Sequence, residues 1–348
     1  MTQEDLTPPQ PPEPLRPDVH RMEEPPLSEN IFEQVDEPSP APPRFSPRYP
    51  WLPLILFLLT CLTTWYSGTL LFGGWGGFQY SISVLAILGA HEMGHYLQSR
   101  RYGVPASLPM FIPMPLTPIG TMGAVIFQQP GVAGRRAMFD IAISGPLAGL
   151  IVALPILFHG LRNATVLTFS PEAGGLIFAD PLLIKLLSRW LHGPLAEGQD
   201  LQLNPFLFAG WVGVFITALN MFPLGQLDGG HILYTLLGRR SYPLVRGLFV
   251  LLVSLVVVGS LTTDSGYLGW GLMLFLVWKT GIAHPPTSDD SQPLGRFRVI
   301  LGWITLTFVF WGFVPRPIYE KPGTPPEPKK ATEILQDRAP PKVTSPDA

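Results

Sequence analysis

The chain has 348 residues, of which 47% are hydrophobic and only 14% are charged, and its formal net charge at pH 7 is -2. Soluble proteins carry about 25% charged residues, so this composition argues against an ordinary soluble protein and favours a polytopic membrane protein. The balanced charge, without a basic stripe, argues against nucleic acid as a partner. The one cysteine, Cys61, rules out a disulfide framework and a thiolate metal site.

Residues 1–48 are rich in Pro, Glu, Asp and Gln and hold few aliphatic side chains. Such a segment cannot bury enough apolar surface to offset the loss of chain entropy, so we predict a disordered N-terminal tail. It has neither the basic start and apolar core of a signal peptide nor the character of a transit peptide. Residues 317–348 predict a second disordered tail, which leaves 49–316 as the membrane domain.

The membrane domain consists mainly of apolar runs, and about 20 residues suffice to cross a bilayer as a helix. The runs are roughly 51–72, 80–99, 138–160, 205–223, 244–262, 266–283 and 298–315. We therefore predict an all-α polytopic membrane protein with about seven transmembrane helices.

Basic residues flank one set of the ends of these runs. They are Arg44, Arg48, Arg100, Arg101, Arg135, Arg136, Arg239, Arg240, Arg246, Arg296 and Arg298. By the positive-inside rule these ends are cytoplasmic, which places the N-terminal tail in the cytoplasm. An odd number of crossings would put the C-terminal tail on the other side, although that tail also carries Lys321, Lys329 and Lys330.

The second run contains His91-Glu92-Met93-Gly94-His95, an H-E-x-x-H motif. On a helix, imidazoles four residues apart share one face and can bind the same zinc ion. Ionisable residues are costly inside a membrane span and therefore indicate function. We predict His91 and His95 as ligands of Zn²⁺ and Glu92 as the general base that activates water. The alternative is two histidines that only bond to neighbouring helices.

The connection from Gly103 to Gly134 is apolar but contains repeated prolines, which forbid a helix. Its core, Ile119 to Phe127, predicts a short extended or hairpin segment between the second and third spans. Irregular apolar backbone beside a membrane is tolerated only where protein buries it or where it lines a cavity. We therefore expect this loop to lie over the metal site on the cytoplasmic side.

A catalytic zinc ion needs a third protein ligand and an open position for water. The run from Asn220 to His231 reads Asn-Met-Phe-Pro-Leu-Gly-Gln-Leu-Asp-Gly-Gly-His. Pro and Gly residues end the helix there, and paired glycines after Asp228 let two segments approach closely. Asp228 is thus a plausible oxygen ligand. The competing interpretations are a simple turn at Asp228, and His231 as the ligand rather than a structural residue.

These motifs resemble the site-2 protease family of intramembrane zinc metalloproteases. The resemblance rests on His91–His95, on Asn220 to Gly230 and on Ser144-Gly145-Pro146-Leu147-Ala148-Gly149, and it covers about residues 80–235. It implies that His91, His95 and Asp228 bind zinc, that Glu92 activates water, and that Asn220 holds the substrate strand or the oxyanion. It also implies a substrate-binding role for a loop containing Gly120, Thr121, Met122 and Gly123. The chain looks most like a branch that lacks a PDZ domain.

The topology must bring these ligands to one depth. The segment 181–192 is too short to cross and carries Lys185 and Arg189 at helical spacing, which predicts an amphipathic helix at the membrane interface. If 181–192 crossed the membrane, Asp228 would emerge on the face opposite to His91. The charge pattern and the metal geometry therefore agree in placing residues 162–204 on the outer side.

The sequence predicts an intramembrane zinc endopeptidase that cleaves transmembrane segments of membrane proteins, as in regulated intramembrane proteolysis. Its expected partners are the lipid bilayer and a transmembrane protein substrate, with a homo-oligomer left open. The rival interpretations are a catalytically inactive membrane scaffold and a transporter, the latter suggested by broken spans with intramembrane charge. The acidic N-terminal tail favours a bacterial inner (cytoplasmic) membrane over a plastid membrane.

Overall fold

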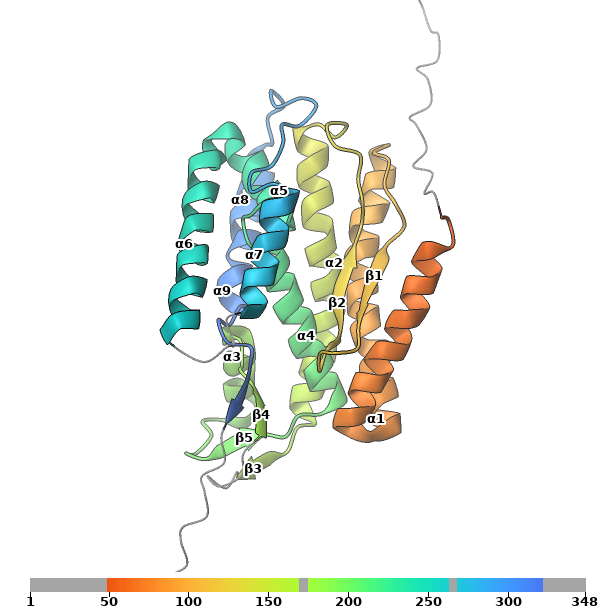
Figure 1. The fold of residues 1–348 in the computed structure, drawn as a ribbon, viewed down its shortest axis with the longest axis vertical. Helices are drawn as coiled ribbons and strands as arrows, with labels where there is room; N and C mark the ends of the chain where they lie inside the picture. Colours follow the sequence, from red (N-terminus) through yellow and green to blue (C-terminus); the bar gives the residue numbers. More distant parts are fainter. Residues whose placement is uncertain (1–48, 169–174, 263–267, 322–348) are drawn as a thin grey trace, which may run out of the picture. The chain divides into compact units, whose positions relative to one another are not determined.

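The computed structural model describes residues 49–168, 175–262 and 268–321. The predicted N-terminal tail, 1–48, lies outside the described residues, as does most of the predicted C-terminal tail. Within the described part the fold is predominantly helical, as the sequence predicts (Figure 1). The long helices with enough apolar residues to cross a membrane are Leu52–Arg101, Arg135–Arg162 and Asp228–Thr262, and shorter apolar helices are Pro205–Asn220 and Trp270–Thr280. The count of seven crossings remains a prediction.

Helix α1, Leu52–Arg101, is a helical hairpin that contains both of the first two predicted spans. Gly73 breaks it with φ 77° and ψ 173°, a conformation that residues with a Cβ rarely adopt. The two arms then pack together, and the hydroxyls of Thr64 and Ser81 form a hydrogen bond of 2.7 Å between them. Trp65 also donates from Nε1 to the carbonyl of Gly74 at 3.3 Å.

The proline-rich connection forms the hairpin that the sequence predicts. Strand β1, Met110–Met114, pairs antiparallel with β2, Gly120–Val125. Gly120 has φ 78°, and a Cβ added there would lie 2.7 Å from the carbonyl oxygen of Thr63 in the first arm of α1. The hydroxyl of Tyr80 in the second arm donates to Ile119 at 2.6 Å. Both arms of α1 therefore fix the hairpin in place.

Helix α2, Arg135–Arg162, packs against both α1 and α4, Pro205–Asn220. Glycines let α2 and α4 cross closely: a Cβ on Gly210 would lie 2.6 Å from Leu157. The largest buried cluster surrounds this crossing and includes the fully buried Phe208 and Trp211. This three-element core positions the residues of the candidate site.

The segment between α2 and α4 holds β3, Val166–Thr168, then β4, Gly175–Phe178, then α3, Leu182–His192, and then β5, Gln199–Leu201. The predicted amphipathic helix is α3, with Ile184 buried and Trp190 72% exposed. The short strands are not foreseen by the sequence: β3 pairs with β5, and β4 pairs with β6, Ile318–Lys321. Strand β6 lies within the predicted C-terminal tail, and Ile318 packs on the main core.

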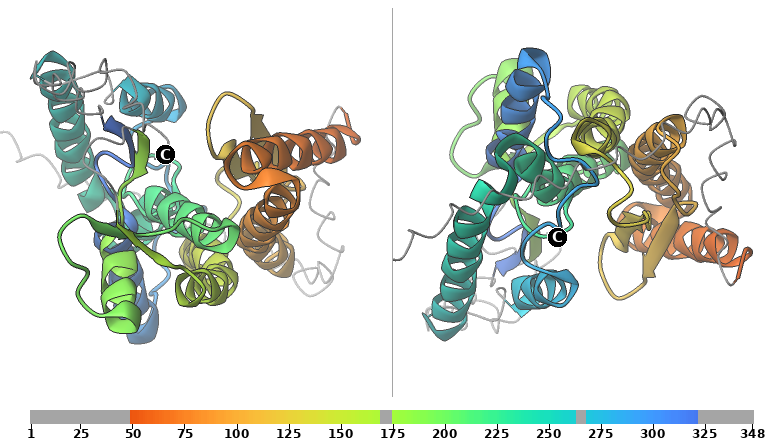
Figure 2. Two further views of the ribbon diagram at one scale, coloured as in Figure 1. Left: turned by 90° about the horizontal axis from the view of Figure 1, so that it is seen from below. Right: turned by 90° about the horizontal axis from the view of Figure 1, so that it is seen from above.

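The remaining helices follow the loop after α4. They are α5, Asp228–Leu237; the 3-10 turn η2, Gly238–Arg240; α6, Ser241–Thr262; α7, Leu268–Thr280; α8, Arg296–Leu306; and α9, Phe308–Gly312. The single run predicted at 298–315 is therefore divided between α8 and α9, with a break at Thr307. Figure 2 shows the helices from the two ends of the view in Figure 1, with the two arms of α1 next to each other and α6 on the opposite side.

Candidate metal centre

The second arm of α1 carries the H-E-x-x-H motif on its buried side. His91, Glu92 and His95 are 3%, 5% and 7% exposed. The four-residue spacing brings the two imidazoles together, with their Nε2 atoms 3.2 Å apart. The predicted face-sharing of His91 and His95 is therefore observed.

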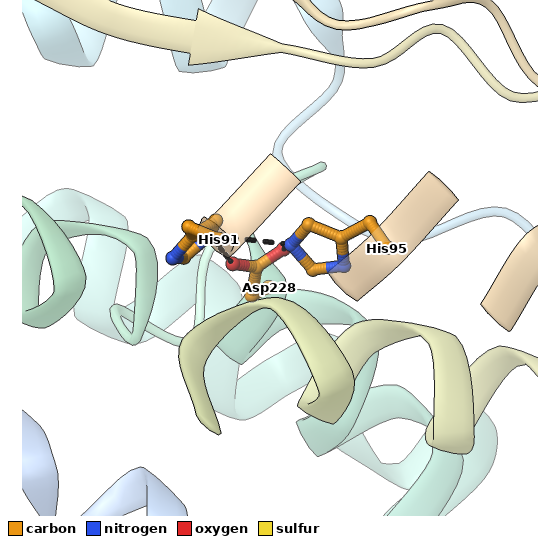
Figure 3. A group of neighbouring side chains, drawn as sticks. All are labelled: His91, His95 and Asp228. Atoms are coloured by element: carbon orange, nitrogen blue, oxygen red, sulfur yellow. Dashed lines mark hydrogen bonds and ion pairs between the residues drawn. The ribbon is translucent and has the colours of Figure 1, made fainter. Parts of the chain in front are cut away.

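Asp228 reaches these imidazoles because the chain breaks between α4 and α5. A Cβ on Gly229 would lie 2.1 Å from the carbonyl oxygen of Met221, and one on Gly230 would lie 2.5 Å from that of Gly225. The paired glycines thus allow the start of α5 to pack against the loop before it. The carboxylate of Asp228 lies 3.1 Å from Nε2 of His91 and 3.2 Å from Nε2 of His95 (Figure 3).

The geometry of these three side chains fits a metal ion. Their ligand atoms all lie within 4.8 Å of one another. Zinc bonds of about 2.0–2.1 Å in a tetrahedron put neighbouring ligand atoms about 3.3 Å apart, close to the separations of 3.1–3.2 Å found here. Two imidazoles and a carboxylate also match the donors that zinc prefers.

The surroundings of His91 support this assignment. Its Nε2 atom lies 3.1 Å from the carboxylate of Asp228, 3.2 Å from Nε2 of His95 and 3.2 Å from Nδ2 of Asn220. One ring nitrogen carries either one proton or one lone pair, so it cannot make a hydrogen bond to each of these neighbours. A cation bound by the lone pairs of both imidazoles and by the carboxylate would account for the separations from Asp228 and His95.

A backbone carbonyl fixes the orientation of His95. Its Nδ1 lies 2.8 Å from the carbonyl oxygen of Ile141 in α2, which can only accept a proton. Nδ1 therefore carries a proton, and in the neutral ring this leaves the lone pair of Nε2, which faces His91 and Asp228, available to a metal ion. In the same turn of α2, a Cβ on Gly145 would lie 2.0 Å from Nε2 of His95. The absence of a side chain at Gly145 therefore lets α2 pack directly against the imidazole.

The remaining predicted site residues lie at the end of α4 and in the β1–β2 hairpin. Asn220 ends α4 and contacts His91. Thr121 is buried, and its hydroxyl donates to Ile112 within the hairpin at 2.9 Å. Met122 is 46% exposed, and a Cβ on Gly123 would lie 4.0 Å from Ile216 of α4. Of the four predicted substrate-binding residues of the hairpin, Gly120 packs on α1, Met122 faces outward and Gly123 faces α4.

The other described histidines are not members of this group of possible metal ligands. The ring of His231 packs edge-on against His284, with centroids 4.6 Å apart. His192 contacts the carbonyl of Leu161 at 2.9 Å, and the ring of His159 packs against Phe206.

Comparison with known proteins adds an independent observation. A model of peptidase family M50 matches residues 79–259. The chain is 29% identical over 238 residues to the protein named probable zinc metalloprotease EGY2, chloroplastic, of Arabidopsis thaliana, covering 66% of this chain and 40% of the relative. The corresponding EGY1 proteins of Oryza sativa subsp. japonica and A. thaliana are 32% and 31% identical, with 62% and 67% of this chain and 36% and 42% of each relative covered.

The chain thus spans about two fifths of the length of these curated relatives. No solved structure matches the chain. The family match covers both halves of the metal cluster, from His91 to Asp228, and extends over more than half of the sequence. The chain therefore belongs to peptidase family M50, the site-2 protease family.

Proposed function

We propose that this protein is a zinc-dependent endopeptidase that cleaves transmembrane segments of membrane proteins within the bilayer. The observation that carries the proposal is the convergence of His91, His95 and Asp228 at hydrogen-bond separations inside an apolar helix bundle, with Glu92 next to the first ligand. Burying these ionisable groups inside a membrane span destabilises the fold. A catalytic metal centre gives a reason for such a cost, whereas a scaffold gives none.

The proposed chemistry divides between the metal and the chain. Zinc bound by His91, His95 and Asp228 would polarise the scissile carbonyl and acidify a water molecule to a pKa near neutrality. The carboxylate of Glu92 then accepts a proton from the attacking water and returns it to the leaving amine nitrogen. The amide of Asn220, at the end of α4, would donate to the substrate carbonyl oxygen as negative charge develops there.

Substrate binding is proposed at the β1–β2 hairpin. In the described residues β2 pairs only with β1, so its other edge can accept an extended strand. Gly123 in β2 lies beside Ile216, one helical turn before Asn220. A substrate strand added to this edge would run toward the end of α4. A transmembrane helix must unwind before cleavage, and strand addition would stabilise the unwound form.

The membrane topology is proposed from the sequence and two contacts. Arg135 at the start of α2 donates to Leu236 at the end of α5, so the basic ends of these helices lie together, as the positive-inside rule requires. At the other end, β4 pairs with β6. Four of the seven proposed crossings lie between β4 and β6 in the sequence. An even number of crossings returns the chain to the same side of the membrane, which is consistent with the pairing of these two strands.

The compartment proposed from the sequence needs revision. The comparisons give no support to a bacterial inner membrane, because the matched relatives are named chloroplastic. We infer a multi-pass protein of a plastid-type membrane, with the predicted N-terminal tail and the start of α2 on the same side.

Replacement of Glu92 tests the proposed function. The variant Glu92→Gln should keep zinc and lose cleavage of a model transmembrane substrate in liposomes, because the amide cannot accept the proton. Glu197→Gln, on an exposed loop, is the matched control and should cleave as the wild type does. Wild-type cleavage by Glu92→Gln would contradict the role of Glu92. Zinc binding by a wild type that never cleaves would favour a scaffold, and solute flux without cleavage would favour a transporter.

A further inference from the structure

The helix that delivers Asp228 is intrinsically weak. Helix α5 has only 10 residues, and Gly229 and Gly230 occupy its first turn. Glycine stabilises a helix less than alanine does, because it loses more backbone freedom when the helix forms. The position of Asp228 must therefore depend on contacts that other elements make with α5.

Arg135 makes such contacts at the far end of α5. Its Nε donates to the carbonyl of Thr235 at 2.6 Å, and its Nη2 donates to that of Leu236 at 3.1 Å. Carbonyls in the last turn of a helix lack partners within the helix. A guanidinium bound to two of them satisfies both and interacts favourably with the negative end of the helix dipole.

A second element holds α5 from the side. We call residues 281–295, between α7 and α8, the 281–295 segment; it follows the region that the family model matches. The amide of Gly225 donates to Ile282 at 2.9 Å, just before α5 begins. The hydroxyl of Tyr234 donates to Asp290 at 2.7 Å, near the end of α5. The segment therefore contacts the chain on both sides of Asp228.

Arg135 also joins this segment to α2. Its backbone amide donates to the carbonyl of Asp289 at 3.2 Å, and its Nη1 lies 3.4 Å from the carbonyl of Asp290. Helix α2 is the helix whose Ile141 carbonyl orients His95. One residue thus links the support of His95 with the helix that begins at Asp228.

We propose that Arg135 is a positioning residue, which by bridging α2, α5 and the 281–295 segment holds the carboxylate of Asp228 opposite His91 and His95. The proposal rests on the proposed function in that Asp228 is taken as a metal ligand. It assigns Arg135 no contact with substrate. Its effect is on the rigidity of α5 and, through that rigidity, on zinc affinity.

The test compares two adjacent arginines in the full-length protein. Arg135→Gln removes the two hydrogen bonds to the carbonyls of α5. Arg136→Gln removes an exposed side chain that donates from Nε to Pro293 of the 281–295 segment but does not bond to α5, so the pair isolates the direct contact with α5. Hydrogen exchange of the α5 amides is measured on metal-free protein, and zinc affinity is measured by competition with a chelator. For Arg135→Gln we expect α5 exchange to rise at least about tenfold and zinc affinity to fall about 10–100-fold.

Arg136→Gln should stay within about threefold of the wild type in both measurements, and Arg135→Lys should recover part of the loss, since a lysine can still bind one carbonyl. If Arg135→Gln does not fold, Tyr234→Phe tests the same support more gently, with smaller changes in the same direction. Unchanged exchange, or faster exchange with unchanged zinc affinity, would overturn the proposal. A wild type that binds no zinc would overturn the proposed function instead, and the exchange measurement would still decide whether Arg135 holds α5.

Discussion

Gly145 of α2 lies directly against the ring of His95, so that a Cβ at this position would come within 2.0 Å of Nε2. Nε2 is the atom that faces His91 and Asp228. The contact means that α2 forms a wall of the metal centre, and that the space occupied by the imidazole exists only because residue 145 has no side chain. Helix packing and metal binding therefore depend on the same position.

Gly145→Ala should abolish high-affinity zinc binding, because the methyl group must displace the imidazole of His95. Zinc content of the purified variant checks this. Gly247→Ala is the matched control, since a Cβ on Gly247 in α6 meets no atom within 4 Å. It should bind zinc like the wild type, and equal zinc in both variants would show that the ring of His95 is not needed where the structure places it.

Asp228→Asn should weaken zinc binding by more than about 100-fold. The amide keeps the size of the side chain but loses the negative charge that faces both imidazoles, and losing a ligand costs more than the roughly 10–100-fold that loss of a ligand's hydrogen-bond partner costs. Chelator competition measures the affinity. Asp200→Asn, in the exposed strand β5, provides the comparison. A loss of less than about threefold in Asp228→Asn would contradict its role as a ligand.

Asn220→Ala should separate binding of the metal from catalysis. We expect zinc affinity within about tenfold of the wild type, because Asn220 is not among the ligand atoms. Removal of one oxyanion donor costs about 10²–10³ in kcat, so kcat should fall by about that factor. Kinetics on a transmembrane substrate check the prediction. A variant with normal kcat and raised KM would instead place Asn220 in substrate binding.

The pH dependence of the protein's stability should reflect Asp180, which lies in the loop that joins β4 to α3. Burial, followed by the charge of Asp200, raises the pKa of Asp180 to about 6 from 3.8. The folded state therefore keeps a proton that the unfolded state has lost, so this contribution to stability is complete below about pH 4 and is lost as the pH rises through about 6.

Asp180→Asn removes this titration. The melting temperature of the variant in detergent should exceed that of the wild type by a few degrees near pH 7.5, and the difference should shrink toward zero near pH 4. Metal-free protein is used at both values, so that loss of zinc does not contribute. Glu197→Gln should follow the wild type. A difference for Asp180→Asn that does not change with pH would exclude the raised pKa as its cause.

Sequence reasoning found the side chains of the candidate site because their chemistry is visible in the residue types. Two histidines at helical spacing within an apolar run indicate a shared face, and His91 and His95 lie as that pattern predicts. Asp228 follows residues that end a helix, and the break is observed between α4 and α5. The prolines of the connection forbid a helix, and a hairpin forms there.

The supporting groups could not be predicted because they carry no signature in the sequence. The carbonyls of Ile141 and Leu236 are groups that every residue has, so their bonds to His95 and Arg135 depend on tertiary packing alone. In the sequence Arg135 indicates only the cytoplasmic side of the membrane. Strands as short as β4 and β6 are too brief to show a periodic pattern of apolar residues, so the sequence predicts a disordered tail where β6 forms.

Zinc-edge X-ray absorption on purified full-length protein loaded with zinc tests the proposed metal centre directly. We expect one bound zinc ion per chain with imidazole nitrogens and a carboxylate oxygen at about 2.0–2.2 Å, no sulfur, and loss of this spectrum in Asp228→Ala. A protein that takes up no stoichiometric zinc, or whose zinc spectrum is the same in Asp228→Ala, would contradict the claim that His91, His95 and Asp228 together form the metal centre.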